Sequence, residues 1–317
     1  MRRWFRTLPV IAAAATALLL PPRPCLAWGP EGHRVVALIA DRLLQQSDPE
    51  IRTKVQALLA TDKDNGLTKS DIASEATWAD VLRDKSPEAR LGTSAWHAVR
   101  FKPDNPDIAA ACFGRKPLPS GYPASRGPQD NCVVDKLTQF LAELKNPETS
   151  QFQRLAAVKF VLNLAGEVND PLNAIDRGDQ GGHCTVVQVG PQPPLRLSTY
   201  WDEKLVRQVV GANVAQAAAR LATEFPPAET RSWAEGTPET WARENFEIAK
   251  SVTYALGAEP TDSKFQFPAK KGQTESCQSL ALYRVGPEYE EKAFAAVKMQ
   301  LAKAGVRLAR MLRDGFK

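Results

Sequence analysis

The sequence has no apolar run long enough to cross a membrane. Its longest run, residues 10–20 (VIAAAATALLL), falls well short of the roughly 20 apolar residues that a spanning helix needs. The run follows Arg2, Arg3 and Arg6 and precedes a proline-broken stretch ending in CLA, which is the layout of a cleavable secretory signal. We therefore predict a signal peptide over residues 1–27, no stable membrane anchor, and an exported protein, periplasmic or extracellular.

The predicted cleavage lies between Ala27 and Trp28. An uncleaved anchor and a lipidated Cys25 are the alternatives, but Cys25 follows Pro-Arg-Pro instead of small aliphatic residues. Cleavage removes four arginines and no acid, so the formal net charge falls from +5 to +1. The mature chain therefore lacks the basic excess that attracts polyanions over its whole surface, and any nucleic-acid binding must be local.

The sequence also lacks the CxxC spacing of many zinc sites. An even number of cysteines remains after cleavage, and in an exported protein this indicates two disulfides. Four cysteines allow three pairings, of which we favour Cys112 with Cys132 and Cys184 with Cys277; a zinc site is the alternative.

Apolar residues recur at helical spacing along most of the chain. In residues 32–46 they fall at Val35, Val36, Ile39, Leu43 and Leu44. The pattern predicts an all-α protein with a single compact helical domain over residues 28–317, and it recurs over residues 49–60, 70–84, 132–145, 150–168, 202–224, 239–256 and 287–314.

Two stretches are expected to be irregular. Residues 102–131 are rich in proline and glycine, and residues 257–286 are polar with few periodic apolar positions. Between residues 185 and 200, TVVQV and LRLSTY flank GPQPP, which predicts one short β-hairpin. No internal repeat is present, and the interleaving of helices and loops defines no second domain.

Histidine is scarce, so each of the three residues carries weight: His33, His97 and His183. Cleavage before Trp28 would free an α-amine five residues from His33, and an amine, its carbonyl and an imidazole can chelate one metal ion. His97 lies beside a tryptophan in SAWHAVRF. Taken singly, each histidine is more often a structural residue than a ligand.

The segment 155–168 (LAAVKFVLNLAGEV) is apolar nearly all round and should be buried. Its exceptions include Asn163 and Glu167, which are four residues apart and share one helix face. A buried carboxylate needs a cation, a metal or a hydrogen-bond donor. A structural polar cluster and a metal site are therefore both consistent with this helix.

Several motifs together resemble a known family. They are WGPEGHRVVALIA, TWADVLR, WHAVRF, FVLNLAGEVNDPLN, RGDQGGH, STYWD, TWARENFEIA and GVRLARML. Their order and spacing resemble those of the zinc-dependent single-strand nucleases of the S1/P1 type, which are related to bacterial zinc phospholipase C. The resemblance covers almost the whole chain from Trp28, and it implies an all-α fold that holds three zinc ions, two of them as a bridged pair.

Carried over by position, the resemblance implies a ligand set for each metal ion. One ion of the pair would be held by the amine and carbonyl of Trp28, by His33 and by Glu167. The other would use Asp80, His97, Asn163 and the same bridging Glu167. Arg83 matches the arginine that steadies the phosphate in the family. The third ion would fall on Asn173, Ser198 and Asp202.

The sequence departs from the family at several of these ligands. Asn163, Asn173 and Ser198 stand where the family carries histidine, and Glu167 stands where it carries aspartate. Ala98 replaces the base-stacking aromatic residue, and His183 replaces the asparagine of the GGN loop. These departures change the implied metal ligands and leave the motif frame intact.

The substitutions differ in their expected effect. Glutamate for aspartate keeps the charge and the oxygen donor. Asn163 is a weak, neutral oxygen ligand that suits Mg, Mn or Ca better than zinc. Asn173 and Ser198 leave the third site with Asp202 alone, which is too little for a structural zinc site. We therefore expect up to two zinc ions, or Mg, Mn or Ca instead, and an empty third site; for His183 a loop hydrogen bond is favoured over an inward ligand.

Two functions remain open on this sequence. The first is an exported metal-dependent phosphodiesterase (endonuclease) that hydrolyses single-stranded DNA, RNA or nucleotides, with Asp80, Arg83, His97 and Glu167 at the reaction centre and with reduced activity. The second is a non-catalytic relative that binds a nucleotide, a phosphate or a protein partner in the same pocket. A phospholipase C type of lipid phosphodiesterase fits the motifs less well. The sequence defines no oligomeric state.

Overall fold

A computed structural model of the chain describes residues 27–63, 66–268 and 275–317, so the predicted signal segment lies outside it except for Ala27. The described chain is mostly helical, as predicted. Its helices are α1 (Gly29–Ser47), α2 (Pro49–Leu59), α3 (Ile72–Glu75), α4 (Trp78–Lys85), α5 (Pro87–Thr93), α6 (Ile108–Ala111), α7 (Val133–Lys145), α8 (Gln151–Glu167), α9 (Leu197–Thr199), α10 (Val206–Val210), α11 (Val214–Leu221), α12 (Pro227–Trp233), α13 (Pro238–Ile248) and α14 (Pro287–Phe316).

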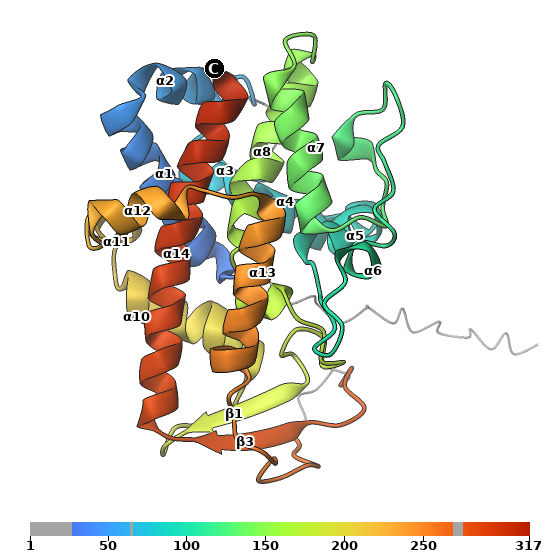
Figure 1. The fold of residues 1–317 in the computed structure, drawn as a ribbon, viewed down its shortest axis with the longest axis vertical. Coiled ribbons are helices and arrows are strands. Elements are labelled where there is room, and N and C mark those ends of the chain that lie inside the picture. The colour runs from blue at the N-terminus through green and yellow to red at the C-terminus, as the bar shows by residue number, and fades with distance from the viewer. Residues whose placement is uncertain (1–26, 64–65, 269–274) are drawn as a thin grey trace, which may run out of the picture.

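Helix α8 lies among the longest helices of the fold. It packs on α7 and α14, and α14 in turn packs along α1. Figure 1 shows α7, α8, α13 and α14 running along the long axis, with the sheet at the end away from the C-terminus. This packing encloses the C-terminal half of α8, where the polar residues of the motif lie.

The sequence of α8 explains both its start and its burial. Ser150 caps the helix by accepting a hydrogen bond from the amide of Gln153, and the Gln153 side chain reciprocates in a capping box. Every residue from Ala157 to Glu167 is buried, as expected for a helix that is apolar all round.

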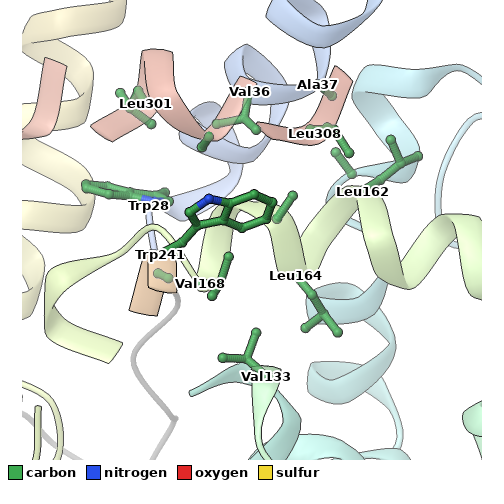
Figure 2. Close-up of a cluster of buried hydrophobic side chains, with 14 of the residues drawn as sticks. Trp28, Val36, Ala37, Val133, Leu162, Leu164, Val168, Trp241, Leu301 and Leu308 are labelled. Carbon is green, nitrogen blue, oxygen red and sulfur yellow. The ribbon is translucent and has the colours of Figure 1, made fainter. Parts of the chain in front are cut away.

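The N-terminal segment is anchored in the core beside α8. Trp28 is fully buried, and its indole Nε1 donates to the carbonyl of Gly166 at 3.0 Å. Figure 2 shows Trp28 and Trp241 in one buried cluster, together with Leu301 of α14. The residue predicted to begin the mature chain is therefore held against the helix that carries Glu167.

The predicted β-hairpin is present, but it belongs to a larger sheet. Strands β1 (Thr185–Val189) and β2 (Leu195–Arg196) pair antiparallel, and β3 (Ala281–Val285) pairs parallel with β1. The expectation that residues 257–286 are irregular was therefore wrong for β3. The strand pairs with β1, which is far away in the sequence. Its residues show no clear alternation between buried and exposed positions.

Some helix boundaries also differ from the prediction. Residues 70–84 form two helices, α3 and α4, separated by Ala76 and Thr77. Residues 202–224 begin within a π-helical segment, Tyr200–Leu205, and break again between α10 and α11. The helices α5, α6 and α12 were not predicted, because they are too short to show a clear period. Residues 197–199, which were expected to continue the second strand of the hairpin, form the short helix α9 instead.

Both favoured disulfides, Cys112–Cys132 and Cys184–Cys277, are confirmed. Cys112–Cys132 closes the loop before α7, and Cys184–Cys277 joins the residue before β1 to the segment before β3. Among the described residues, no helix has the length and apolarity required to span a bilayer.

Candidate metal centre

Four elements bring the predicted site residues together in the core. His33 comes from α1, Asp80 and Arg83 from α4, His97 from the 3-10 segment Ser94–His97, and Asn163 and Glu167 from α8. All six side chains are buried. We call His33, Asp80, His97, Asn163 and Glu167 the polar cluster.

Asp80 lies at the centre of the polar cluster. Its Oδ1 accepts a hydrogen bond from Nη2 of Arg83 at 2.9 Å, one helical turn away. Its Oδ2 lies 3.4 Å from Nε2 of His33 and accepts a hydrogen bond from the Asn163 amide at 2.8 Å. The carboxylate therefore faces an imidazole, a guanidinium and an amide at once.

Glu167 forms the other half of the polar cluster. Its Oε1 lies 2.7 Å from Nδ1 of His97 and 3.8 Å from Nε2 of His33. Its Oε2 accepts a hydrogen bond from the side-chain amide of Asn173 at 2.6 Å. One carboxyl thus connects both histidines, which is the bridging position expected from the resemblance.

The amide of Asn163 has a defined orientation. Its Nδ2 donates to Asp80 and, at 3.0 Å, to the carbonyl of Ala76. Because a carboxylate and a carbonyl can only accept, the nitrogen must face them. The Oδ1 of Asn163 is buried and has no hydrogen-bond partner within the described chain, so it is the atom left for a cation or a water molecule.

A glycine allows α1 and α8 to approach each other at the polar cluster. A Cβ on Gly166 would lie 2.8 Å from Nδ1 of His33, which is closer than real side chains come. Any other residue at this position would displace the imidazole.

The carbonyl of Trp28 is a predicted ligand. It accepts a hydrogen bond from the backbone amide of Gly32 at 3.1 Å at the start of α1.

Burial dominates the electrostatics of the polar cluster. It raises the pKa of Glu167 to about 8, with the nearby Asp80 acting in the same direction. It lowers the pKa of His97 to about 3, helped by the Arg83 charge. For Asp80 the effect of burial is outweighed by His33, Arg83 and His97, which hold its pKa below the usual value.

The atoms of the polar cluster fit a divalent metal ion. The His33 Nε2 and His97 Nε2 atoms, like the Asn163 Oδ1, are buried without a hydrogen-bond partner in the described residues. Ligand atoms of His33, Asp80 and Glu167 lie within 4.8 Å of one another. Imidazole nitrogens with carboxylates are the donors that zinc prefers. The Nδ1 atom of His97 faces Oδ1 of Asp80 at 3.5 Å and Oε1 of Glu167 at 2.7 Å, so it is the nitrogen of His97 that could share an ion with these carboxylates.

The residues of the predicted third site and His183 are not members of the polar cluster. Asn173 lies in the 3-10 segment Pro171–Asn173, and its amide is engaged with Glu167. Ser198 is buried near Gly182 of the glycine-rich loop, residues 178–182. Asp202 is buried near Gly29 at the start of α1. The His183 side chain groups with Glu275 and Cys277, apart from the polar cluster.

Two charged residues near the polar cluster were overlooked in the sequence. Asp170 is fully buried three residues after Glu167, and burial raises its pKa to about 8. Arg100 follows His97 by three residues. Both lie inside motifs that were already recognised, so their position beside predicted ligands was the available signal.

Comparison with known proteins places the whole described fold in one family. The family model for S1/P1 Nuclease matches residues 28–317. The chain belongs to the S1/P1 nuclease family. This match confirms the resemblance identified from the motifs, and it begins at the residue predicted to start the mature chain.

Named relatives of this S1/P1 family member align along nearly their whole length. Nuclease S1 of Aspergillus oryzae is 25% identical over 323 residues, covering 97% of this chain and 96% of the relative. Endonuclease 4 of Arabidopsis thaliana is 23% identical over 322 residues, covering 100% and 96%. Nuclease P1 of Penicillium citrinum is 21% identical over 297 residues, covering 90% and 97%.

Proposed function

We propose that the chain is an exported, metal-dependent phosphodiester hydrolase that cleaves single-stranded nucleic acid at the polar cluster. The observation that carries the proposal is the convergence of His33, Asp80, His97 and Glu167 beside the buried guanidinium of Arg83. Membership of the S1/P1 nuclease family supports the same chemistry. The two disulfides support an oxidising compartment and hence export.

In this proposal, His33, Asp80, His97, Glu167 and the Trp28 amine freed by cleavage hold up to two divalent ions, zinc or a harder cation. Such ions supply Lewis acidity toward phosphate oxygens and lower the pKa of water. The polar cluster would have to ionise Glu167 to bind them, and a cation would stabilise that ionised form against burial.

Arg83 has a separate role in the proposed reaction. Asp80 orients the Arg83 guanidinium through Nη2. The Nε of Arg83 is buried without a hydrogen-bond partner in the described parts of the chain. A guanidinium fixed in this way matches the oxygens of a phosphate and can stabilise charge that develops during in-line displacement. We assign phosphate binding to Arg83.

The substituted ligands favour a slower enzyme. Asn163 and Asn173 present amide N–H groups to Asp80 and Glu167, so they satisfy carboxylates where histidines would bind metal. The same observation favours the second candidate function, a non-catalytic relative that binds nucleotide, phosphate or a protein partner, because the carboxylates have internal donors without any ion.

The test uses residues 28–317, purified with both disulfides and supplied in turn with zinc, magnesium, manganese and calcium. We expect metal-dependent cleavage of single-stranded DNA or RNA in preference to duplex. Arg83→Ala should lower the rate about 100-fold or more, while Arg231→Ala, an exposed arginine on α12, should not. Tight nucleotide binding without cleavage under every metal would favour the non-catalytic function.

A further inference from the structure

Arg100 carries a charge that the polar cluster does not use. It is partly buried, and its Nε is buried without a hydrogen-bond partner. Within the described chain, we find no side-chain hydrogen bond or direct ion pair for this guanidinium. Removing part of a guanidinium from water is costly unless an anion or an acceptor compensates, so Arg100 is suited to a ligand from outside the chain.

The backbone sets the side of its segment from which the Arg100 side chain extends. The amides of Val99 and Phe101 bond to carbonyls of residues 173–174 at 3.0 and 3.1 Å, and both side chains are buried. Side chains alternate along an extended segment. Ala98 and Arg100 therefore share the opposite side, where Ala98 presents only a methyl group.

The glycine-rich loop forms a cradle for this guanidinium. A Cβ on Gly181 would lie 3.0 Å from Nη2 of Arg100. Gly181 and Gly182 have a positive φ, a conformation that glycine adopts more readily than a residue with a Cβ atom, and Gln180 before them shares it. At Gly181 the loop thus brings backbone close to the guanidinium without placing a side chain there.

Nearby carboxyl groups compensate the positive charge of Arg100 only in part. Arg100 acts electrostatically on Asp170 and Asp176, but Asp176 already accepts hydrogen bonds from Lys102 and the amide of Gly178. The Oδ2 of Asp170 is itself without a hydrogen-bond partner among the described residues. A counter-charge for Asp170 is therefore the competing role for Arg100.

We propose that Arg100 is a phosphate-binding subsite for the strand, one phosphate away from the group that reaches the polar cluster. The inference rests on the proposed function. Arg100 is three positions from His97 along the chain, which limits the backbone span between them to about 10 Å. A guanidinium fork binds phosphate in a bidentate manner. Substrates with more than one phosphate should therefore bind better than those with one.

The experiment measures binding of fluorescein-labelled oligothymidylate d(T)5 by anisotropy to the wild type and to Arg100→Gln, Arg100→Lys and Arg231→Ala. We expect at least tenfold weaker binding for Arg100→Gln, an intermediate loss for Arg100→Lys, and a change below twofold for Arg231→Ala. The slope of log affinity against log salt should fall by about 0.7 for Arg100→Gln, since one phosphate contact is lost. The dinucleotide d(TpT), with one phosphate, should show a smaller loss.

Three outcomes would overturn the subsite. They are unchanged d(T)5 binding by Arg100→Gln, an equal loss with Arg231→Ala, and lower thermal stability with no change in the salt slope, which would make Arg100 a counter-charge for Asp170. If Arg100→Gln does not fold, Arg100→Lys keeps the charge and tests the fork alone. Titration with inorganic phosphate separates the two proposals: weaker phosphate binding by Arg100→Gln supports the subsite even if the wild type cleaves nothing.

Discussion

Asn173 donates its side-chain amide to Oε2 of Glu167 at 2.6 Å, and both residues are buried. The residue at the position that the resemblance assigns to an outlying metal ion therefore supports the carboxyl of Glu167 instead, in keeping with the expectation that the third site is empty. Asn163 does the same for Asp80. Two amides, at positions where the resemblance leads us to expect histidine, thus give the polar cluster donors of its own.

The first prediction follows from that pair. Asn173→Ala should leave Glu167 Oε2 buried without a donor, and we expect unfolding to become easier by about 1–3 kcal/mol. Chemical denaturation of the metal-free protein measures this change. Asn105→Ala, an exposed asparagine, is the matched control and should stay within about 0.5 kcal/mol of the wild type. Equal stability of the two variants would contradict the pairing.

The second prediction concerns Lys136 on α7. Its ammonium donates to the carbonyl of Gly127 at 3.0 Å and lies 4.0 Å from the centre of the Trp96 ring. Burial lowers the pKa of Lys136 to about 7, against the opposing effect of Glu143 and Asp135. An unfolded lysine keeps its proton up to about pH 10.4.

The sign of the pH dependence follows from these values. Between about pH 7 and pH 10 the unfolded state binds the extra proton, so this residue makes stability rise with pH, by up to about 1.4 kcal/mol per unit. We expect the stability difference between the wild type and Lys136→Met to grow in favour of the wild type over that range. Lys85→Met, at an exposed position, should show no such trend, and a flat difference for Lys136→Met would refute the assignment.

The third prediction is that the exported chain begins at Trp28. Ala27 meets the small-residue requirement of signal cleavage, and only this cut frees the amine that could complete the metal site. Intact-mass measurement of secreted protein tests it. Ala27→Phe should block the cut and retain the leader, whereas a wild-type chain starting at Met1 or at a lipidated Cys25 would remove Trp28 from the ligand set.

The fourth prediction is that the mature protein retains at most two metal ions per chain. Elemental analysis after removal of loosely bound metal gives the count. His97→Ala should lower it, because that imidazole belongs to the polar cluster. His183→Ala should not, because His183 lies with Glu275. Three tightly held zinc ions in the wild type would show that the third site is intact.

The motifs predicted the helical core and named the residues that meet in the polar cluster, whose role as metal ligands stays a prediction. Apolar periodicity located α7 and α8 within one residue of their observed starts, because a buried helix keeps its pattern over several turns. The convergence of His33, Asp80, His97 and Glu167 depends on long-range packing that periodicity does not encode. It became predictable only through the order of the motifs.

Other features could not be read from the chain. The pairing of β3 with β1 joins segments almost a hundred residues apart, which local pattern does not specify. The direction of an amide is another example: the sequence shows Asn163 and Asn173, but only the surrounding acceptors show that their nitrogens face the carboxylates. Asp170 and Arg100 were not predicted as site residues because their place inside a motif does not by itself show that a charge is buried.

The last prediction separates a weakened nuclease from a binding protein. Asn163→His, Asn173→His and Ser198→His together would return imidazoles to the positions that the family occupies with histidine. A metal site acts as a unit, so single changes should give little and the triple variant most of the gain. With zinc, we expect at least about a tenfold rise in hydrolysis of single-stranded DNA or RNA, equal to roughly 1.4 kcal/mol of barrier. If the triple variant folds, holds three zinc ions and cuts neither single-stranded DNA nor single-stranded RNA, the pocket differs from that of a nuclease in more than its metal ligands. Ala98, which offers no ring for a base to stack on, would then be the next residue to restore.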